Sequence, residues 1–179
     1  MSKMDWVDPA VWYTQLPTVH VAAMALIRDT TGRILVVKPN YRPHWTLPGG
    51  MADEGESPDA TVAREVREEL DFSFEPSHLA VIDWASPQGK RKRPLIAFIF
   101  NAGVIESPDI KLQKSELDEW KFVALDEMGP LMSSAGVSRI KSAIRAISED
   151  CTVLLVDGIE MRASSSQDFK TPPINGSLS

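Results

Sequence analysis

The chain has 179 residues, a length that fits one domain with a sizeable hydrophobic core. Hydrophobic residues make up 43% of it and charged residues 25%, which are ordinary values for a globular protein, and the net charge is −6. This acidic balance argues against a dedicated nucleic-acid-binding protein, which would normally present a basic face. We therefore expect no nucleic-acid polymer as a partner.

Cysteine usage and hydropathy bear on the compartment. The single cysteine, Cys151, excludes an internal disulfide and is compatible with a reducing cytoplasm. The N-terminal residues contain no apolar stretch of the kind found in secretory signals. No uninterrupted apolar segment approaches the length that spans a bilayer. We therefore expect a cytoplasmic protein with no membrane partner.

Residues 1–17 form an N-terminal extension, with Trp6, Trp12 and Tyr13 among prolines and polar side chains. We expect these aromatic side chains to pack onto the domain, and packing onto a second subunit is the alternative. The domain itself is predicted over residues 18–160. The tail, residues 161–179, is polar and rich in proline, glycine and serine, which predicts disorder.

Strands and helices are mixed in the domain without regular alternation. Apolar runs between turn residues predict strands at Val19–Arg28, Ile34–Lys38, Leu79–Trp84, Leu95–Val104, Trp120–Leu125 and Cys151–Val156. Apolar residues at helical spacing predict an amphipathic helix over Ser138–Ile147 that packs on the sheet. Polar loops are expected at Lys38–Trp45 and Ala85–Pro94. This pattern alone supports an α/β or an α+β fold class.

A further helix is predicted from Pro58 to Leu70. Ser57 can cap its first turn, and proline fits the first helical position. Val62, Val66 and Leu70 recur every four residues, which makes a narrow stripe that faces the core. The helix is therefore expected to lie against the sheet along one narrow face.

Three glutamates, Glu65, Glu68 and Glu69, share one edge of this helix, since they fall within an arc of about 100° beside the apolar stripe. Like charges at this spacing repel, and they also lie where the helix dipole is negative. A bound divalent cation would offset both costs, and a site made of carboxylate oxygens suits magnesium, or manganese as the alternative. The competing interpretation is an ordinary solvated helix face.

The wider spacing around the glutamates favours a metal site over a solvated face. A match at all the specified positions would arise by chance on the order of once in 10⁷ starting points. Those positions are Gly50, Glu56, Arg64, Glu65, Glu68 and Glu69. The chain resembles the Nudix hydrolases here, whose signature is G-x5-E-x7-R-E-U-x-E-E-x-G-U, with U a bulky aliphatic residue. It departs from that signature at Asp71, where the family usually has glycine, and aspartate tolerates the left-handed conformation needed there.

The resemblance covers roughly residues 18–148. It implies an α/β fold, a Nudix-type α/β/α sandwich with a mixed β-sheet. It also implies hydrolysis of a nucleoside diphosphate linked to another group. By position, Glu65, Glu68 and Glu69 would bind magnesium, and Arg64 would orient these glutamates. Glu56 would support the loop before the helix. The glycines Gly49 and Gly50 would approach the substrate, with Gly50 allowing the turn.

Further candidate residues lie outside the signature. A general base in this family is either a signature glutamate or one from a later loop, and Glu116 is favoured here over Glu119. The cations Lys90, Arg91 and Arg93 are candidates for gripping a distal phosphate, and a charged hairpin tip is the alternative.

The segment before the signature supplies two more candidate substrate-binding residues, Arg42 and Trp45. The tryptophan can stack on a base or pack in the core. Pro87 lies close to the place where family members that act on ADP-ribose often carry proline, and a proline that marks the end of a strand is the alternative.

Three functions remain open from the sequence. The leading one is a magnesium-dependent pyrophosphohydrolase acting on a nucleoside diphosphate derivative such as ADP-ribose or a nucleotide sugar. The alternative is a house-cleaning pyrophosphatase acting on damaged nucleoside triphosphates. A ligand-sensing module without turnover is the third, although such modules would be expected to lose signature glutamates. The resemblance also makes a homodimer plausible.

Overall fold

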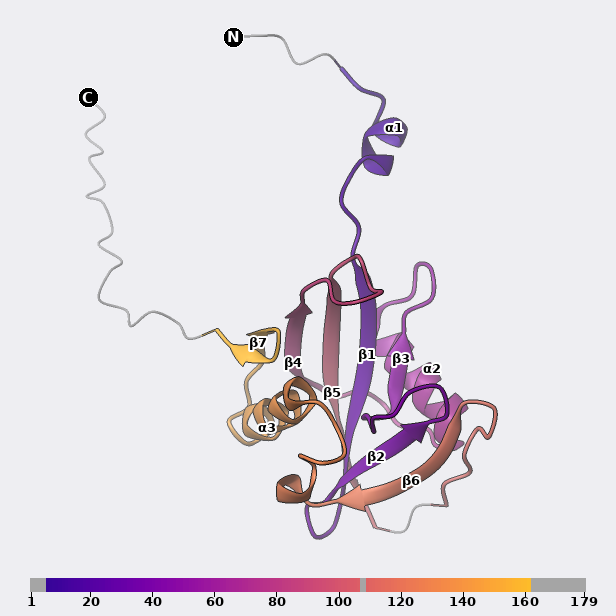
Figure 1. Ribbon diagram of the computed structural model, residues 1–179, viewed down its shortest axis with the longest axis vertical. Helices are drawn as coiled ribbons and strands as arrows, with labels where there is room; N and C mark the ends of the chain where they lie inside the picture. Colours follow the sequence, from indigo (N-terminus) through magenta and orange to yellow (C-terminus); the bar gives the residue numbers. More distant parts are fainter. Residues whose placement is uncertain (1–5, 107–108, 162–179) are drawn as a thin grey trace, which may run out of the picture.

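The computed structural model describes residues 6–106 and 109–161 of the chain (Figure 1). Its centre is one mixed sheet with the order β6-β2-β1-β5-β4-β7-β8, in which β3 pairs separately with β1. The β1–β5 and β4–β7 pairs are parallel and the others are antiparallel. The strands are β1 (His20–Asp29), β2 (Ile34–Pro39), β3 (Gly49–Met51), β4 (His78–Ala85), β5 (Leu95–Ile105), β6 (Leu117–Val123), β7 (Val153–Val156) and β8 (Ile159–Glu160).

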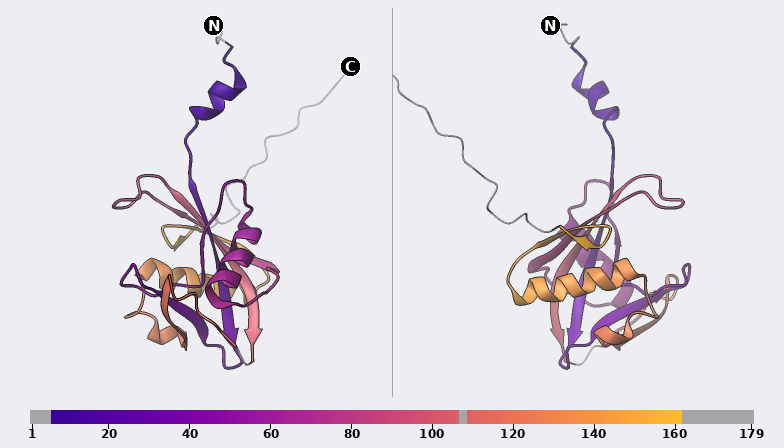
Figure 2. Two further views of the ribbon diagram at one scale, coloured as in Figure 1. Left: turned by 90° about the vertical axis from the view of Figure 1, so that its right-hand side faces the viewer. Right: turned by 60° about the vertical axis from the view of Figure 1, so that its left-hand side comes forward.

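Helices cover both faces of the sheet (Figures 1 and 2). Helix α2 (Pro58–Leu70) packs on β1, β3 and β5, and helix α3 (Ser134–Ser148) packs on β4, β5 and β7. A short helix α1 (Pro9–Thr14) precedes the sheet, and a 3₁₀ turn η1 (Leu125–Glu127) follows β6. The predicted α/β/α sandwich with a mixed sheet is therefore confirmed.

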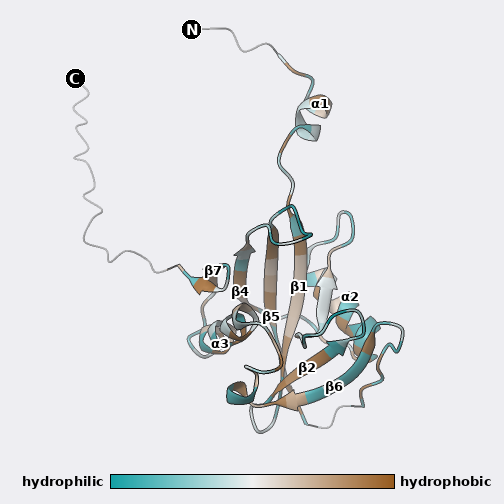
Figure 3. Cartoon of the chain, in the orientation of Figure 1, coloured by the Kyte–Doolittle hydropathy of each residue, from teal (hydrophilic) through white to brown (hydrophobic). Residues whose placement is uncertain are grey.

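Alternation along the central strands divides the core into two layers. In β1, Ala25 and Ile27 pack toward α2, whereas Leu26 packs toward α3. In β2, Leu35 and Val37 likewise belong to the α2 layer, while the residues between and before them face α3. A strand buried on both faces needs apolar residues at nearly every position. Figure 3 shows this apolar character along the central strands.

The edge of β1 is shared by two strands. Its C-terminal end pairs with β2, whereas Ala22 to Met24 pair with β3. The chain between β2 and β3 is fixed at one point by mutual backbone hydrogen bonds between Val37 and Thr46. The loop of residues 40–45 and the strand β3 are thereby held beside the same stretch of sheet, next to α2.

The two ends of α2 differ from their sequence-based predictions in one respect. Ser57 occupies the N-cap position, but its side chain makes no capping hydrogen bond, so the predicted cap is wrong in that detail. The hydroxyl of Thr61 instead lies 2.9 Å from the Ser57 carbonyl. At the other end Asp71 has φ 52° and ψ 34°, the left-handed conformation expected of the residue that replaces the family glycine.

The N-terminal aromatic residues do not pack onto the domain, so that prediction is wrong. Trp6 is 80% exposed and Tyr13 is 66% exposed, and α1 buries none of its residues. Figure 1 shows α1 standing clear of the sheet. Trp12 and Tyr13 lie within a helix of six residues, which is too short to bury them without a partner surface, and Trp6 precedes this helix.

Most predicted strands agree with the observed ones to within two residues, with three exceptions. Strand β6 spans Leu117–Val123, whereas Trp120–Leu125 was predicted. It starts earlier because Leu117 still pairs with Pro39 at the end of β2. The strands β3 and β8 were not predicted. Disorder was predicted for the tail, residues 161–179. Residues 162–179 lie outside the described residues, so the prediction is not tested there.

None of the described helices combines the length and the apolar character that crossing a membrane would require.

Candidate active site

Two adjacent glycines shape the backbone beside α2, and each is required for a different reason. Gly49 has φ 131°, and a Cβ on it would lie 2.2 Å from the Ala23 carbonyl oxygen of β1. Gly50 has no such backbone requirement, but a Cβ there would lie 2.5 Å from Glu65 Oε1. The prediction that Gly50 allows the turn is therefore corrected: Gly49 provides the unusual backbone conformation, and Gly50 admits the glutamate carboxylate.

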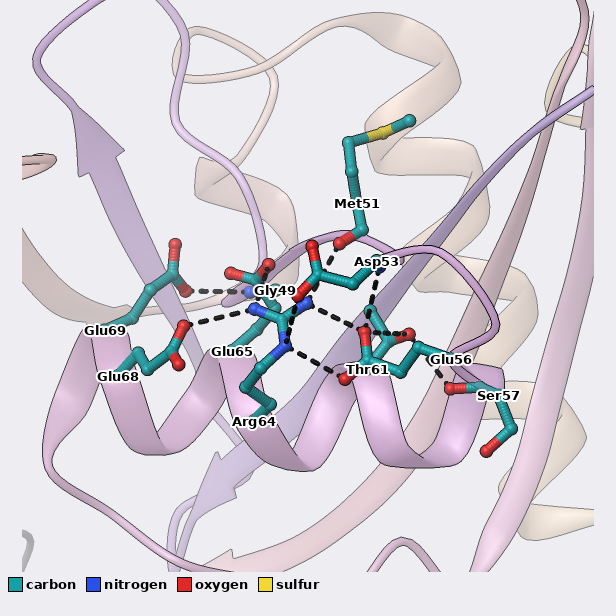
Figure 4. Close-up of polar contacts among 10 residues, drawn as sticks. All are labelled: Gly49, Met51, Asp53, Glu56, Ser57, Thr61, Arg64, Glu65, Glu68 and Glu69. Carbon is teal, nitrogen blue, oxygen red and sulfur yellow. Dashed lines mark hydrogen bonds and ion pairs between the residues drawn. The ribbon is translucent and has the colours of Figure 1, made fainter.

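Arg64 connects the residues of the signature (Figure 4). Its Nε and Nη2 donate to both carboxylate oxygens of Glu56 at 2.9 Å, which is a bidentate pair. Its Nη1 donates to Glu65 at 2.9 Å and to Glu68 at 3.1 Å, and Nη2 also donates to the Met51 carbonyl at 3.0 Å. One guanidinium therefore holds two glutamates of the helix and the loop that faces them.

Glu56 closes the loop before α2. Besides pairing with Arg64, its carboxylate accepts hydrogen bonds from the Asp53 amide at 3.1 Å and from the Thr61 hydroxyl at 3.0 Å. Hydrogen bonding to Arg64 and then to Asp53 lowers the Glu56 pKa to about 2. Glu56 is therefore a charged brace between the loop and the first turns of the helix.

Glu69 lies deeper than the other glutamates of the helix. Its side chain is buried, and Oε2 accepts a hydrogen bond from the Gly49 amide at 2.8 Å. Desolvation raises the Glu69 pKa to about 8; the Gly49 hydrogen bond opposes this, and the nearby charges of Glu65 and Glu116 add to the rise. Burial likewise raises the pKa of Glu65. The site thus gathers more negative charge than its own hydrogen bonds stabilise.

Glu65 and Glu69 line a cavity of about 460 Å³, which we call the catalytic cavity. Glu116 from the turn before β6 lines it together with Glu65 and Glu69, whereas Glu119 does not line it. Its other polar or charged lining side chains include Arg42, Tyr41 and Arg139. Of the two loop glutamates considered in the sequence, Glu116 is thus the one placed beside the signature glutamates.

A second cavity of about 200 Å³, the apolar cavity, lies between the sheet and α3. Its walls include Trp45, His44 and apolar residues of β1, β5 and α3. Trp45 also packs against the core, and Lys121 Nζ lies 4.3 Å from the centre of its ring. Both proposed roles of Trp45 are therefore compatible with its position. The residues that line both cavities are Met24, Arg42, Thr46 and Arg139.

The cations of the loop between β4 and β5 line neither of these two cavities. Arg91 is bound by its own loop, since its Nη1 donates to the Ala85 and Arg93 carbonyls and its Nη2 to the Ser86 carbonyl. Lys90 and Arg93 are exposed. Phosphate binding by this loop stays a prediction for Lys90 and Arg93, while Arg91 has a visible structural role.

The three metal-binding candidates do not yet converge on one point. In the described part of the chain, no three His, Cys, Asp or Glu side chains are arranged as a metal site. Glu65 and Glu68 turn to Arg64, and Glu69 turns to Gly49. The donor set nevertheless fits a hard divalent cation, because it consists of carboxylates that are partly or fully desolvated.

Sequence reasoning missed the part of the site that comes from distant segments. Asp83 on β4 is fully buried and pairs with Arg139 on α3, and Arg139 lines both cavities. Thr61, a buried polar side chain next to Glu56, was also missed. The sequence offered one signal for this pair, an aspartate within an apolar strand. A buried carboxylate is costly without a partner, so such an aspartate implies a nearby cation.

Comparisons with known proteins agree with the geometry. A profile of the NUDIX domain matches residues 18–145. A MutT-like protein from Streptomyces ambofaciens is 27% identical over 129 residues, which cover 72% of this chain and 78% of that protein. A putative ADP-ribose pyrophosphatase from Bacillus subtilis (strain 168) is 42% identical over 52 residues, but these cover only 28% of this chain and 25% of the relative.

Among solved structures, a MutT protein from Methanosarcina mazei Go1 superposes with a TM-score of 0.60 at 27% identity, covering 75% of this chain and 96% of that one. Members of the matched family are pyrophosphohydrolases that act on phosphoric anhydride bonds of small nucleotide substrates and generally use a divalent metal. The chain belongs to the Nudix family and is a hydrolase of this kind.

Proposed function

We propose that the protein is a magnesium-dependent pyrophosphohydrolase that cleaves the diphosphate link of a nucleoside diphosphate derivative, of the ADP-ribose or nucleotide-sugar type. The observation that carries this proposal is the connection between the two cavities, which share four lining residues. One cavity gathers carboxylates suited to a cation, and the described residues that line the other supply an aromatic wall, several apolar side chains and no carboxylate. A nucleoside attached to a diphosphate has the matching division of polarity.

Glu65, Glu68 and Glu69 are the proposed ligands of the magnesium ion. When bound, that ion would neutralise charge on the phosphoryl oxygens and favour departure of the leaving phosphate. Arg64 keeps Glu65 and Glu68 in place through its Nη1, and its bond to Met51 ties them to β3. The Gly49 amide holds Glu69 from the opposite side.

Glu116 is the proposed general base that orients or deprotonates the attacking water. It lines the catalytic cavity opposite α2, and its backbone carbonyl accepts a hydrogen bond from the Asn40 amide at 2.9 Å. That bond ties its turn to the end of β2. A carboxylate that lines the same cavity as Glu65 and Glu69 supports this role, because a general base must be within reach of the attacking water.

The substrate class draws support from the Bacillus subtilis relative, which is named as a putative ADP-ribose pyrophosphatase. Its match is short, so the test is direct. The purified protein is incubated with magnesium and ADP-ribose, nucleotide sugars or nucleoside triphosphates, and the products are identified. We expect nucleoside monophosphate plus a phosphorylated second product. Release of pyrophosphate from triphosphates alone would favour the house-cleaning alternative, and no turnover of any compound would favour a ligand-sensing module.

We further propose that the catalytic domain spans residues 18–160, acts in the cytoplasm and forms a homodimer. The exposed aromatic residues of the N-terminal extension support the dimer, since Trp6, Trp12 and Tyr13 lack a partner surface in the described part of the chain. Light scattering of the full chain and of a variant lacking residues 1–17 would test this proposal.

A further inference from the structure

The pair formed by Asp83 on β4 and Arg139 on α3 lies outside the Nudix signature and borders both cavities. Asp83 has no exposed surface, and one carboxylate oxygen accepts a hydrogen bond from Arg139 Nε. The other oxygen accepts from the Gly158 amide at 3.1 Å. A buried carboxylate with both oxygens bound is a rigid support, and it fixes the guanidinium relative to β4 and the β7–β8 turn.

Arg139 keeps donors available on the side of the cavities. Its side chain is 21% exposed, and within residues 6–106 and 109–161 Nε is the only one of its three guanidinium nitrogens that hydrogen-bonds to protein. The two terminal nitrogens of a guanidinium carry four further N–H donors in a plane. These donors lie at the place where the catalytic and the apolar cavity meet.

The charges around the catalytic cavity show why a fixed cation matters at this place. Glu65, Glu69 and Glu116 line the cavity, and the lining residues with a positive charge are Arg42 and Arg139. Arg42 lies on an exposed loop, with its guanidinium 5.3 Å from the centre of the Tyr41 ring. Of these two cations, Arg139 is the one that a buried partner holds in position.

We propose that Arg139 is a substrate-binding residue that binds phosphoryl oxygens of the diphosphate where the substrate passes between the two cavities. Asp83 is the positioning residue that aims it. The planar guanidinium matches two phosphoryl oxygens, and a carboxylate that immobilises it reduces the entropy lost on binding. This inference rests on the proposed function, and it names the protein group that recognises the diphosphate independently of the signature.

The experiment measures binding of methylenediphosphonate, a diphosphate analogue that resists hydrolysis, by calorimetry in the presence of Mg²⁺. We expect Arg139→Gln to weaken binding about 10- to 100-fold, because charge-assisted hydrogen bonds are lost. Arg139→Lys should fall between the wild type and Arg139→Gln, since it keeps the charge without the planar fork. Arg145→Gln is the matched control on the same helix, because Arg145 pairs with exposed Glu149 and Glu160 outside both cavities.

A double variant shows whether Asp83 affects binding by positioning Arg139 or only by stabilising the fold. Asp83→Asn alone should weaken binding less than Arg139→Gln, and it should have no further effect once Arg139 is Gln. The double variant also leaves no unpaired buried charge, so it carries the test if Arg139→Gln does not fold. Equal binding by the wild type and the folded double variant would overturn the inference and leave the proposed function intact. Failure of the wild type itself to bind would overturn both.

Discussion

The catalytic cavity beside α2 and the apolar cavity beside α3 share four lining residues but differ in how their polar groups are held. Around the catalytic cavity, Arg64, Glu56 and Glu69 are bound by residues at most 20 positions away in the chain. Beside α3, Arg139 is held by Asp83, which lies 56 positions away. The hydrogen bonds around Arg64 thus join residues of one continuous segment, whereas Arg139 is held by a residue that only the packing of α3 on β4 brings near it.

The largest expected effect comes from Glu69→Gln in the continuous segment. If Glu69 binds the magnesium ion, turnover should fall about 10²- to 10³-fold, since several kcal/mol of charge stabilisation are lost at 1.36 kcal/mol per tenfold. Steady-state kinetics with saturating Mg²⁺ measures this loss. Unchanged turnover would remove Glu69 from the site.

The same variant has a second consequence in protein stripped of metal. The folded-state pKa of Glu69 is raised to about 8 from an ordinary 4.5, so its contribution to stability is present below pH 4.5 and is lost as pH rises through 8. Glu69→Gln lacks this titration. In EDTA, the melting temperature of the wild type relative to the variant should therefore decline between about pH 4.5 and 8, and a constant difference would contradict the assigned burial effect.

Two glycine variants separate folding from catalysis within the segment. Gly49→Ala should destabilise the protein by at least about 1–3 kcal/mol, because φ 131° is a glycine conformation and the new Cβ meets the backbone of β1. Gly50→Ala should leave the melting temperature nearly unchanged, because its Cβ meets only the end of the Glu65 side chain. Displacing that carboxylate by about 1 Å should cost about 10²-fold in kcat. Identical behaviour of the two variants would contradict this division.

On the α3 side, Trp45→Leu tests the role of the apolar cavity. If a base stacks on Trp45, KM should rise about tenfold with a smaller change in kcat, since stacking on an aromatic side chain contributes about 1–3 kcal/mol. Trp84→Leu is the matched control, because Trp84 is 38% exposed on β4 and lines neither cavity. Loss of stability with unchanged KM would assign Trp45 to core packing alone.

The smallest expected effect is at Asp71, the residue that departs from the family signature. Asp71→Gly should stabilise the protein by about 1 kcal/mol, because glycine adopts the left-handed conformation without a steric cost. The variant also loses the ion pair with Lys111 at 3.0 Å, but both partners are well exposed and the pair contributes little. Asp71→Ala loses the same ion pair, and alanine cannot adopt the left-handed conformation without a steric cost. The melting temperature of this variant should therefore be below that of the wild type.

Short-range patterns were sufficient for most helices and strands and for the segment that carries the family signature, whereas the layers of the fold were predicted from the resemblance to the family. The period of Val62, Val66 and Leu70 predicted which face of α2 is buried, and all three are buried. The start of α3 was placed four residues late, since Gly136 in its first turn hides a cap formed by Ser133. The strand β3 was not predicted because two of its three residues are glycine.

The remaining site residues depend on pairings that no local pattern specifies. In the sequence, Arg139 looks like any other residue of an amphipathic helix. Its proposed role depends on its ion pair with Asp83 and on the two cavities that it lines. Glu116 and Glu119 lie on the same predicted loop, and the sequence favoured Glu116. They differ because β6 pairs with β2 from Leu117 onward, so that Glu119 lies within the strand and Glu116 lies in the turn before it.

The shared edge of β1 has a consequence for how such a protein diversifies. Backbone hydrogen bonds fix both ends of the loop of residues 40–45. At one end the Asn40 amide donates to the Glu116 carbonyl, and just after the other end Thr46 pairs with Val37. Changes of length or composition between these anchors leave both sheet pairings untouched. Residues of this loop that line the cavities, such as Arg42 and Trp45, can therefore change while the pairing of β3 with β1 is kept.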